Sequence, residues 1–273
     1  MIPLICLTLS LQSCCQTAAG PQRIDLPDGH YWLATPADLD PQQQYPLIIC
    51  LHGTQTKSRD ILDFWLSLDE KLPFILAAPQ AVEAGWRETD LKFIHQFDAH
   101  LRQTVNYDPQ RVLLTGHSAG GAMTFHLLYA DNFQATAIAV TANYLPPTVT
   151  SRMVTARRDL PVFYAVGEAD LNRPRMRDGL AILRGAGANV TVKRPSIGHV
   201  LSRDIGTGAL RWFEDRCRRT VQRRIDAAKL DVETIQEVGP AAADLEDILR
   251  NPNTHFQNQL AQAADRLALL QQP

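Results

Sequence analysis

Short runs rich in apolar residues alternate along the chain with longer segments that carry apolar residues at helical spacing. The runs have strand length and occupy residues 46–51, 74–78, 111–115, 135–141, 161–166 and 190–193. Segments 60–68 and 91–105 show the spacing of three and four that is typical of amphipathic helices, and segment 122–130 is helix-like. This alternation predicts a mainly parallel sheet with helices on both faces, in which ligands bind at the carboxyl ends of the strands.

Two further patterns flank this predicted sheet. Residues 27–29 (Pro-Asp-Gly) form a turn signal between short segments 23–26 and 31–34, which predicts an early antiparallel hairpin. The last segment of the predicted sheet-and-helix unit ends near Trp212. Beyond it, two apolar stripes separated by Gly239 and Pro240 predict a helical C-terminal extension over residues 217–273. We expect this extension to fold as a helical hairpin, either on the rest of the chain or as a homo-oligomer contact.

The amino terminus has the pattern of a targeting segment. Residues 2–11 are almost wholly apolar and too short to span a bilayer, and small and polar residues follow them. The stretch from Leu11 to Cys14 (Leu-Gln-Ser-Cys) resembles a bacterial lipobox. We therefore expect residues 1–19 to direct export to the periplasm or cell envelope, with membrane attachment through a lipidated Cys14. A plain signal cleaved near Ala19, or a buried strand from a misplaced start codon, remain as alternatives.

Composition excludes some functions. The net charge is −2, with 45% hydrophobic and 21% charged residues, so no broad positive field favours nucleic acid as a partner. The five cysteines have no metal-ligand spacing and no regular framework, and we expect no structural disulfide. Arginines cluster between residues 216 and 224, where a solvated helix face is the simpler interpretation and an anionic surface the other.

The motif with the strongest chemical meaning is Gly116-His117-Ser118-Ala119-Gly120. It follows the predicted strand 111–115 and precedes the predicted helix 122–130, which is the context of a nucleophile elbow. Such a sharp turn exposes the serine and needs glycines on both sides, because neighbouring backbone packs closely against it. The amino end of the following helix favours developing negative charge. Ser118 is therefore the candidate nucleophile.

A serine hydroxyl needs a base, and the base needs an acid to orient it. Asp170 follows the predicted strand 161–166, and His199 follows the predicted strand 190–193, which gives the order serine, acid, histidine. Glu168 is the competing acid, and His255 lies in the polar extension far from any predicted strand. The order and the loop positions together predict a catalytic triad of Ser118, Asp170 and His199.

Acyl transfer also requires two donors for the oxyanion. We expect one to be the backbone N–H of Ala119, directly after the nucleophile. The other is expected from residues 52–54 (His-Gly-Thr) after the strand 46–51, as the N–H of Thr54. His52 would orient this loop by hydrogen bonding and not act as a base.

These motifs carry a family resemblance. Residues 51–55, 107–112, 116–121, 167–170 and 198–199 resemble those of the α/β-hydrolase superfamily, and in particular the secreted esterases related to polyhydroxybutyrate depolymerases and feruloyl esterases. The resemblance implies an α/β-hydrolase domain over residues 20–216, a carboxylic ester substrate and no metal or organic cofactor. No paired cysteines or polymer-binding module are recognisable, so a small acyl or aryl ester is expected. Trp86 and Trp65 would either line an acyl pocket or pack in the core.

Three functions remain open at this stage. The first is a serine esterase that works through an acyl-enzyme. The second is a serine peptidase with the same triad, and the third is a non-catalytic binding or scaffold protein with a hydrolase fold. Fold alone does not separate them, because function depends on the site. The presence of all the parts of the catalytic machinery favours an enzyme over a scaffold. It does not separate esterase from peptidase, and the family resemblance implies an ester substrate.

Overall fold

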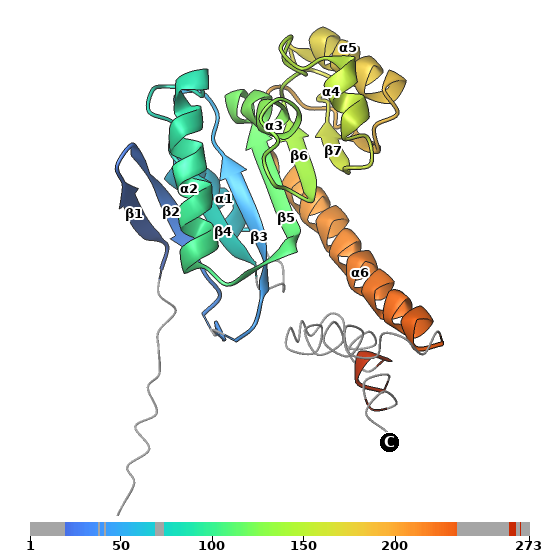
Figure 1. The fold of residues 1–273 in the computed structure, drawn as a ribbon. Helices are drawn as coiled ribbons and strands as arrows, with labels where there is room; N and C mark the ends of the chain where they lie inside the picture. The colour runs from blue at the N-terminus through green and yellow to red at the C-terminus, as the bar shows by residue number, and fades with distance from the viewer. Residues whose placement is uncertain are drawn as a thin grey trace, which may run out of the picture.

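The computed structural model describes residues 20–37, 39–40, 42–68, 74–233, 262–265 and 268 (Figure 1). The predicted targeting segment with Cys14 lies outside the described residues, and so do His255 and most of the second apolar stripe. Within the described ranges no helix is long and apolar enough to cross a membrane.

One sheet of eight strands organises the chain, in the order β1-β2-β4-β3-β5-β6-β7-β8. β1 and β2 form the predicted hairpin, and β2 pairs antiparallel with β4, whereas all the other neighbours are parallel. The strands are β1 (Gln22–Leu26), β2 (Gly29–Ala34), β3 (Tyr45–Leu51), β4 (Ile75–Pro79), β5 (Tyr107–His117), β6 (Ala137–Thr141), β7 (Val162–Ala165) and β8 (Val190–Lys193). The predicted fold class, a mainly parallel sheet in an α/β fold, is confirmed.

Helices cover both faces of this sheet (Figure 1). One face packs against α2, α3, α4 and α5, and the other against α1 and α6. The helices are α1 (Ser58–Leu66), the 3-10 turn η1 (Glu88–Asp90), α2 (Leu91–Thr104), α3 (Ala119–Tyr129), α4 (Ser151–Ala156), α5 (Arg173–Gly185) and α6 (Arg203–Glu233). Alternate side chains of each central strand therefore enter different cores, which explains why these strands read as continuous apolar runs.

β6 illustrates how the two cores differ. Ile138 and Val140 point to the core under α2 to α5, whereas Ala137 and Ala139 point to the core under α1 and α6. The small alanines leave room for large side chains from α6, among them Phe213, which is fully buried. Residue size along a single strand thus determines how closely α6 approaches the sheet.

Two boundaries differ from the sequence expectation at the centre of the sheet. β5 begins four residues before the predicted strand, in the polar stretch Tyr107-Asp108-Pro109-Gln110. Its amino end is held by a buried ion pair, because Arg111 Nε donates to Asp108 Oδ2 at 2.6 Å and the side chains are only 2% and 7% exposed. An apolar-run criterion misses such a strand, since its burial rests on paired charges. α3 likewise begins at Ala119, three residues before the predicted helix.

α6 is the longest helix, with 31 residues. It runs without a break through residue 216, where we placed the end of the hydrolase domain. Beyond that point Cys217, Val221 and Ile225 remain buried in the same core as Phe213, together with Ala263 from the extension. The division between residues 216 and 217 therefore falls inside a helix, and separate folding of the extension stays a prediction.

Candidate active site

Ser118 occupies the turn between β5 and α3. Its backbone has φ 53° and ψ −122°, a conformation that costs a non-glycine residue roughly 1–3 kcal/mol. Hydrogen bonds on both sides hold it there. Ser118 N–H donates to Thr141 O at 3.0 Å, and Ser118 O accepts from Gly121 N–H at 2.8 Å and from Asn143 Nδ2 at 2.5 Å. The next strand, β6, and the residues after it thus fix the strained turn.

The glycines of the motif are required by close backbone packing. A Cβ atom on Gly116 would lie 2.2 Å from Gly120 O, and one on Gly120 would lie 2.2 Å from Leu51 O. Neither contact is one that a flexible side chain could relieve. The elbow is therefore wedged between its own helix and the end of β3.

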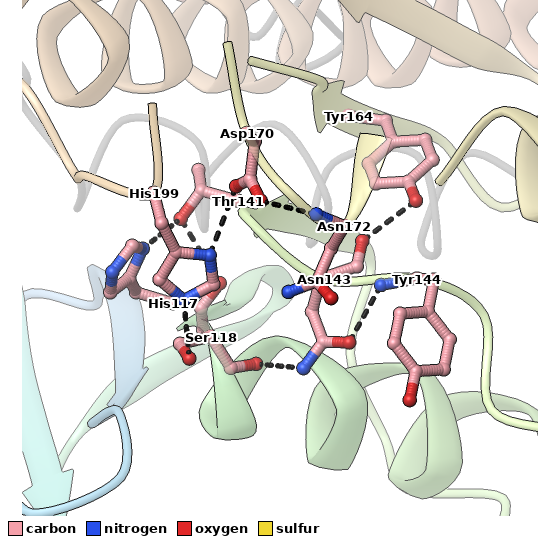
Figure 2. A network of polar contacts seen from close by, with 10 residues as sticks. His117, Ser118, Thr141, Asn143, Tyr144, Tyr164, Asp170, Asn172 and His199 are labelled. Carbon is pink, nitrogen blue, oxygen red and sulfur yellow. Dashed lines mark hydrogen bonds and ion pairs between the residues drawn. The ribbon is translucent and has the colours of Figure 1, made fainter. Parts of the chain in front are cut away.

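The structure brings Ser118, His199 and Asp170 into one hydrogen-bonded chain (Figure 2). Ser118 Oγ lies 2.8 Å from His199 Nε2, and His199 Nδ1 lies 3.0 Å from Asp170 Oδ2. The other Asp170 oxygen, Oδ1, accepts the N–H of Asn172 at 2.8 Å, and the Asp170 side chain is fully buried. With Nδ1–H donating to the carboxylate, Nε2 is the acceptor that faces the serine hydroxyl.

Asp170 and His199 come from two loops that are tied together. The loop after β7 and the loop after β8 pair through Glu168 N–H to Pro195 O at 2.9 Å and Ala169 N–H to Ile197 O at 3.0 Å. The competing acid Glu168 turns away, and its carboxylate accepts from the Ser196 hydroxyl at 3.4 Å in an exposed position. Of the two acids considered from sequence, Asp170 alone contacts His199.

His117 is a neighbour of this chain that the sequence analysis did not single out. Its ring centroid lies 5.4 Å from that of His199, and its Nδ1 lies 3.1 Å from Thr141 Oγ1. Burial, together with the nearby His199, lowers the pKa of His117 to about 4 against a weaker opposing effect of Asp170. His117 is therefore neutral at physiological pH, and its uncharged imidazole lies beside that of His199.

The two expected oxyanion donors lie at the same end of the sheet. Ala119 is the first residue of α3, and first-turn N–H groups of a helix have no intrahelical partner. Thr54 lies in a tight turn in which Thr56 N–H donates to Gly53 O at 3.4 Å and Gln55 has φ 59°. A Cβ atom built on Gly85 would lie 3.4 Å from Thr54 Oγ1 and 3.8 Å from Ala119 Cβ. Thr54 and Ala119 are therefore both adjacent to the space beside Gly85.

His52 holds the turn that carries Thr54. It is fully buried, its Nδ1 lies 2.7 Å from Gly53 O, and its Nε2 accepts the N–H of Ala81 at 3.0 Å. Burial lowers its pKa, which keeps the ring neutral with one nitrogen donating and the other accepting. Trp86 packs on this ring and donates Nε1–H to His52 O at 2.9 Å.

A cavity of about 390 Å³ opens beside the elbow. Its lining includes Trp86, Ala119, Met123 and Pro146, with His126 and Glu88 among the polar residues. Trp65 does not reach it and instead lines a separate cavity with Leu68 and Phe74. Of the two tryptophans considered from sequence, Trp86 is the one that faces the site.

Thr141 and Asn143 are two more site residues that sequence reasoning missed. Besides its bond to Ser118 O, Asn143 accepts the N–H of Tyr144 through Oδ1, and Tyr164 donates its hydroxyl to Asn143 O (Figure 2). The available signal was position, since both residues stand at or just after the carboxyl end of a buried strand.

No group of three or more metal-ligating side chains occurs among the described residues. Cys50 and Cys217 are buried free thiols, and burial raises the pKa of each.

The sequence matches none of the protein-family models and none of the curated proteins with which it was compared. Solved structures do match. A thermostable esterase matches at 18% identity and TM-score 0.57, over 71% of this chain and 62% of that one. A ferulic acid esterase matches at 17% and 0.53, over 67% and 89% of the two chains, and a Bacillus cereus carboxylesterase at 18% and 0.54, over 68% and 93%. This chain thus spans less than two thirds of the length of the thermostable esterase. At identities this low, the structural matches show a shared fold alone.

Proposed function

We propose that this chain, which has the α/β-hydrolase fold, is a serine esterase that cleaves carboxylic esters through an acyl-enzyme. The observation that carries the proposal is the chain of hydrogen bonds from Ser118 through His199 to Asp170, at 2.8 Å and 3.0 Å. Nucleophile, base and orienting acid are each within the reach that proton transfer requires. The matching thermostable esterase and Bacillus cereus carboxylesterase support this proposal at the level of the fold.

Acylation would begin with attack of Ser118 Oγ on the ester carbonyl carbon. His199 Nε2 takes the hydroxyl proton as the Oγ–C bond forms, and Asp170 stabilises the resulting imidazolium. The carbonyl oxygen becomes an oxyanion, which the N–H groups of Ala119 and Thr54 would stabilise at the amino end of α3. The C–O bond to the leaving alcohol then breaks, and the alcohol takes the proton from His199.

Deacylation would reverse these roles with water in place of the alcohol. His199 is neutral again, and it takes a proton from the water as the water oxygen attacks the acyl carbon. The second tetrahedral intermediate collapses, the bond to Ser118 Oγ breaks, and His199 returns the proton to the serine. The products are a carboxylic acid and a regenerated enzyme, with no oxidant or metal in the balance.

The cavity beside the elbow supports a small acyl or aryl ester. Its volume of about 390 Å³ is at the lower end of the usual range for small-ligand sites, roughly 300–1,000 Å³. Trp86, Met123 and Pro146 offer an apolar surface, which suits the acyl or aryl part of a substrate. An extended polymer chain is not needed to fill it.

A substrate panel tests the proposal. p-Nitrophenyl esters of increasing acyl length, hydroxycinnamoyl esters and peptide amides would be assayed with wild type and Ser118→Ala. We expect turnover of esters by wild type only. Amide cleavage that exceeds ester cleavage would favour the serine peptidase, and no Ser118-dependent turnover of any substrate would favour the binding scaffold.

Export and lipid attachment form a separate part of the proposal, supported by the sequence of residues 1–19. Expression in a bacterium with intact lipoprotein processing should place the full chain in the membrane fraction, and Cys14→Ala should release it. Equal distribution of both forms would contradict a lipid anchor. A homo-oligomer through the C-terminal helices would appear as a mass above that of the monomer in light scattering.

A further inference from the structure

A groove lies at the amino ends of the parallel strands, which we call the amino edge of the sheet. Ser118 lies at their carboxyl ends, the carboxyl edge. The groove has a volume of about 980 Å³ and runs between α6 and the segments that lead into β6, β7 and β8. We refer to it as the α6 groove. α6 contributes Arg216, Arg219 and Arg223 to its lining, and the facing segments contribute Thr136, Asp159 and Asn189.

The three arginines share one side of α6, because their spacing of three and four residues places them one above another. Like charges at this spacing repel one another. The pKa of Arg216 is lowered, first by burial and then by the positive charges of Arg219 and Arg223. All three guanidinium-bearing side chains line the same groove, with Arg216 half-buried and Arg219 and Arg223 exposed.

Arg216 is held where water does not satisfy it fully. Its guanidinium lies 4.6 Å from the centre of the Trp212 ring, and its Nε is buried with no hydrogen-bond partner in the described structure. A buried polar group that is left unpaired typically costs about 1–3 kcal/mol. Such a cost is expected where a ligand supplies the missing partner.

The described acids near α6 form ion pairs with a different arginine. Arg218, on another side of the helix, uses the nearby acids, with Glu214 at 3.2 Å and Asp215 at 3.6 Å. Within the described part of the chain no ion pair joins a carboxylate to Arg216, Arg219 or Arg223. Among the described lining residues there are three arginines and one acid, Asp159, so their net charge is +2.

We propose that the α6 groove binds a ligand with a chain of two or more phosphate groups. Guanidinium groups pair with phosphate oxygens through two parallel hydrogen bonds. A phosphate ligand would therefore suit the arginine row better than a neutral ligand. Arg216 and Arg223 are seven residues apart, which is about 10 Å along a helix, so a single phosphate would not contact the whole row. Gln110, Thr136 and Asn189 add polar side chains to the lining.

The test is calorimetric titration of the full chain with sodium tripolyphosphate in about 0.15 M NaCl, where long-range attraction is largely screened. We expect saturable binding with one site per chain, and at least a tenfold weaker affinity for Arg216→Gln and for Arg223→Gln. Arg152→Gln, an exposed substitution on α4, removes the same charge elsewhere and should bind as wild type does. Circular dichroism and thermal unfolding would verify that each variant is folded.

Three results would overturn the proposal. The first is the absence of saturable binding to the wild type. The second is an equal loss of affinity in Arg152→Gln and Arg216→Gln, which would mean attraction by net charge alone. The third is binding to vesicles of anionic phospholipid without binding of tripolyphosphate, which would make the arginine row a membrane contact. None of these results depends on ester hydrolysis, so this proposal and the proposed function fail separately.

Discussion

The two edges of the sheet hold polar groups in opposite ways. At the carboxyl edge, Ser118, His199 and Asp170 satisfy one another, and backbone groups of Asn172 and Thr141 complete the network. At the amino edge, Arg216 Nε is buried without a hydrogen-bond partner among the described residues, and three arginines face a single described acid, Asp159. Burial is costly for polar groups unless they are hydrogen-bonded. The comparison indicates that one edge is organised before any ligand arrives, whereas the other would be completed by its ligand.

The largest expected effect comes from substituting the proposed catalytic residues at the carboxyl edge. Ser118→Ala, His199→Ala and Asp170→Asn should each lower kcat on p-nitrophenyl esters by roughly 10⁴-fold, because the three residues act as a unit. The double variant Ser118→Ala/His199→Ala should be no worse than the single ones. Glu168→Gln is the matched control for Asp170→Asn, since its carboxylate is exposed and contacts Ser196. If Glu168→Gln lost as much activity as Asp170→Asn, the assignment of the acid would be wrong.

The same variants address the amino edge. Ser118→Ala should bind tripolyphosphate with wild-type affinity, because the groove lies at the far ends of the strands. A change in that affinity would show that the two edges are coupled.

The next largest effect concerns the packing of the elbow. Gly120→Ala would place a methyl group 2.2 Å from Leu51 O, so we expect a loss of stability of roughly 3 kcal/mol or a failure to fold. Gly185→Ala is the matched control, since no atom lies within 4 Å of the added Cβ. Urea unfolding would give both free energies. Equal stability of Gly120→Ala and wild type would mean that β3 and α3 are not packed as described.

Acid should lower the free energy of unfolding, because His117 is buried in its neutral form. Its pKa of about 4 in the folded state lies below an unfolded value of about 6.5, so between these pH values the unfolded chain binds more protons. The folded state is therefore stabilised above pH ~6.5 and loses this stability as the pH falls toward ~4, by on the order of 2 kcal/mol. Urea unfolding at several pH values should show a smaller acid loss in His117→Gln. Identical losses in the variant and the wild type would contradict the burial of this ring.

The smallest effect is expected at the acyl cavity. Trp86→Phe keeps an aromatic ring but removes the 2.9 Å hydrogen bond from Nε1 to His52 O, an interaction worth about 1 kcal/mol. We expect kcat/KM for aryl esters to fall about fivefold, with a smaller fall for acetyl esters that do not extend into the cavity. Equal effects on both substrates would place Trp86 outside the substrate site and leave it a role in holding the loop.

The sequence predicted much of the carboxyl edge because the relevant signals are local. Glycines flank Ser118, and the order of Asp170 and His199 after two apolar runs places them at one edge of a parallel sheet. It did not predict His117 as a neutral neighbour, since burial depends on β6 and the loop after β8. It also did not predict the early start of β5, where Arg111 and Asp108 bury each other's charge.

The arginine row at the amino ends of the strands was predicted only in part. Periodicity shows that Arg216, Arg219 and Arg223 share one side of a helix, but it does not show what lies opposite that side. Arg219 and Arg223 are exposed, as a solvated helix face requires, and all three arginines also line the α6 groove. Sequence patterns therefore show which residues share one side of a helix, but they do not show which segments of the chain face that side.

The central claim, that Ser118 is an activated nucleophile, is tested most directly by covalent labelling. The full chain would be treated with a fluorophosphonate probe, and the modified peptide would be identified by mass spectrometry. We predict one phosphonylated residue, Ser118, with no labelling of Ser118→Ala and strongly slowed labelling of His199→Ala, because the hydroxyl then lacks its base. Labelling of a different residue in the wild type, or no labelling of Ser118 in folded protein, would contradict the claim.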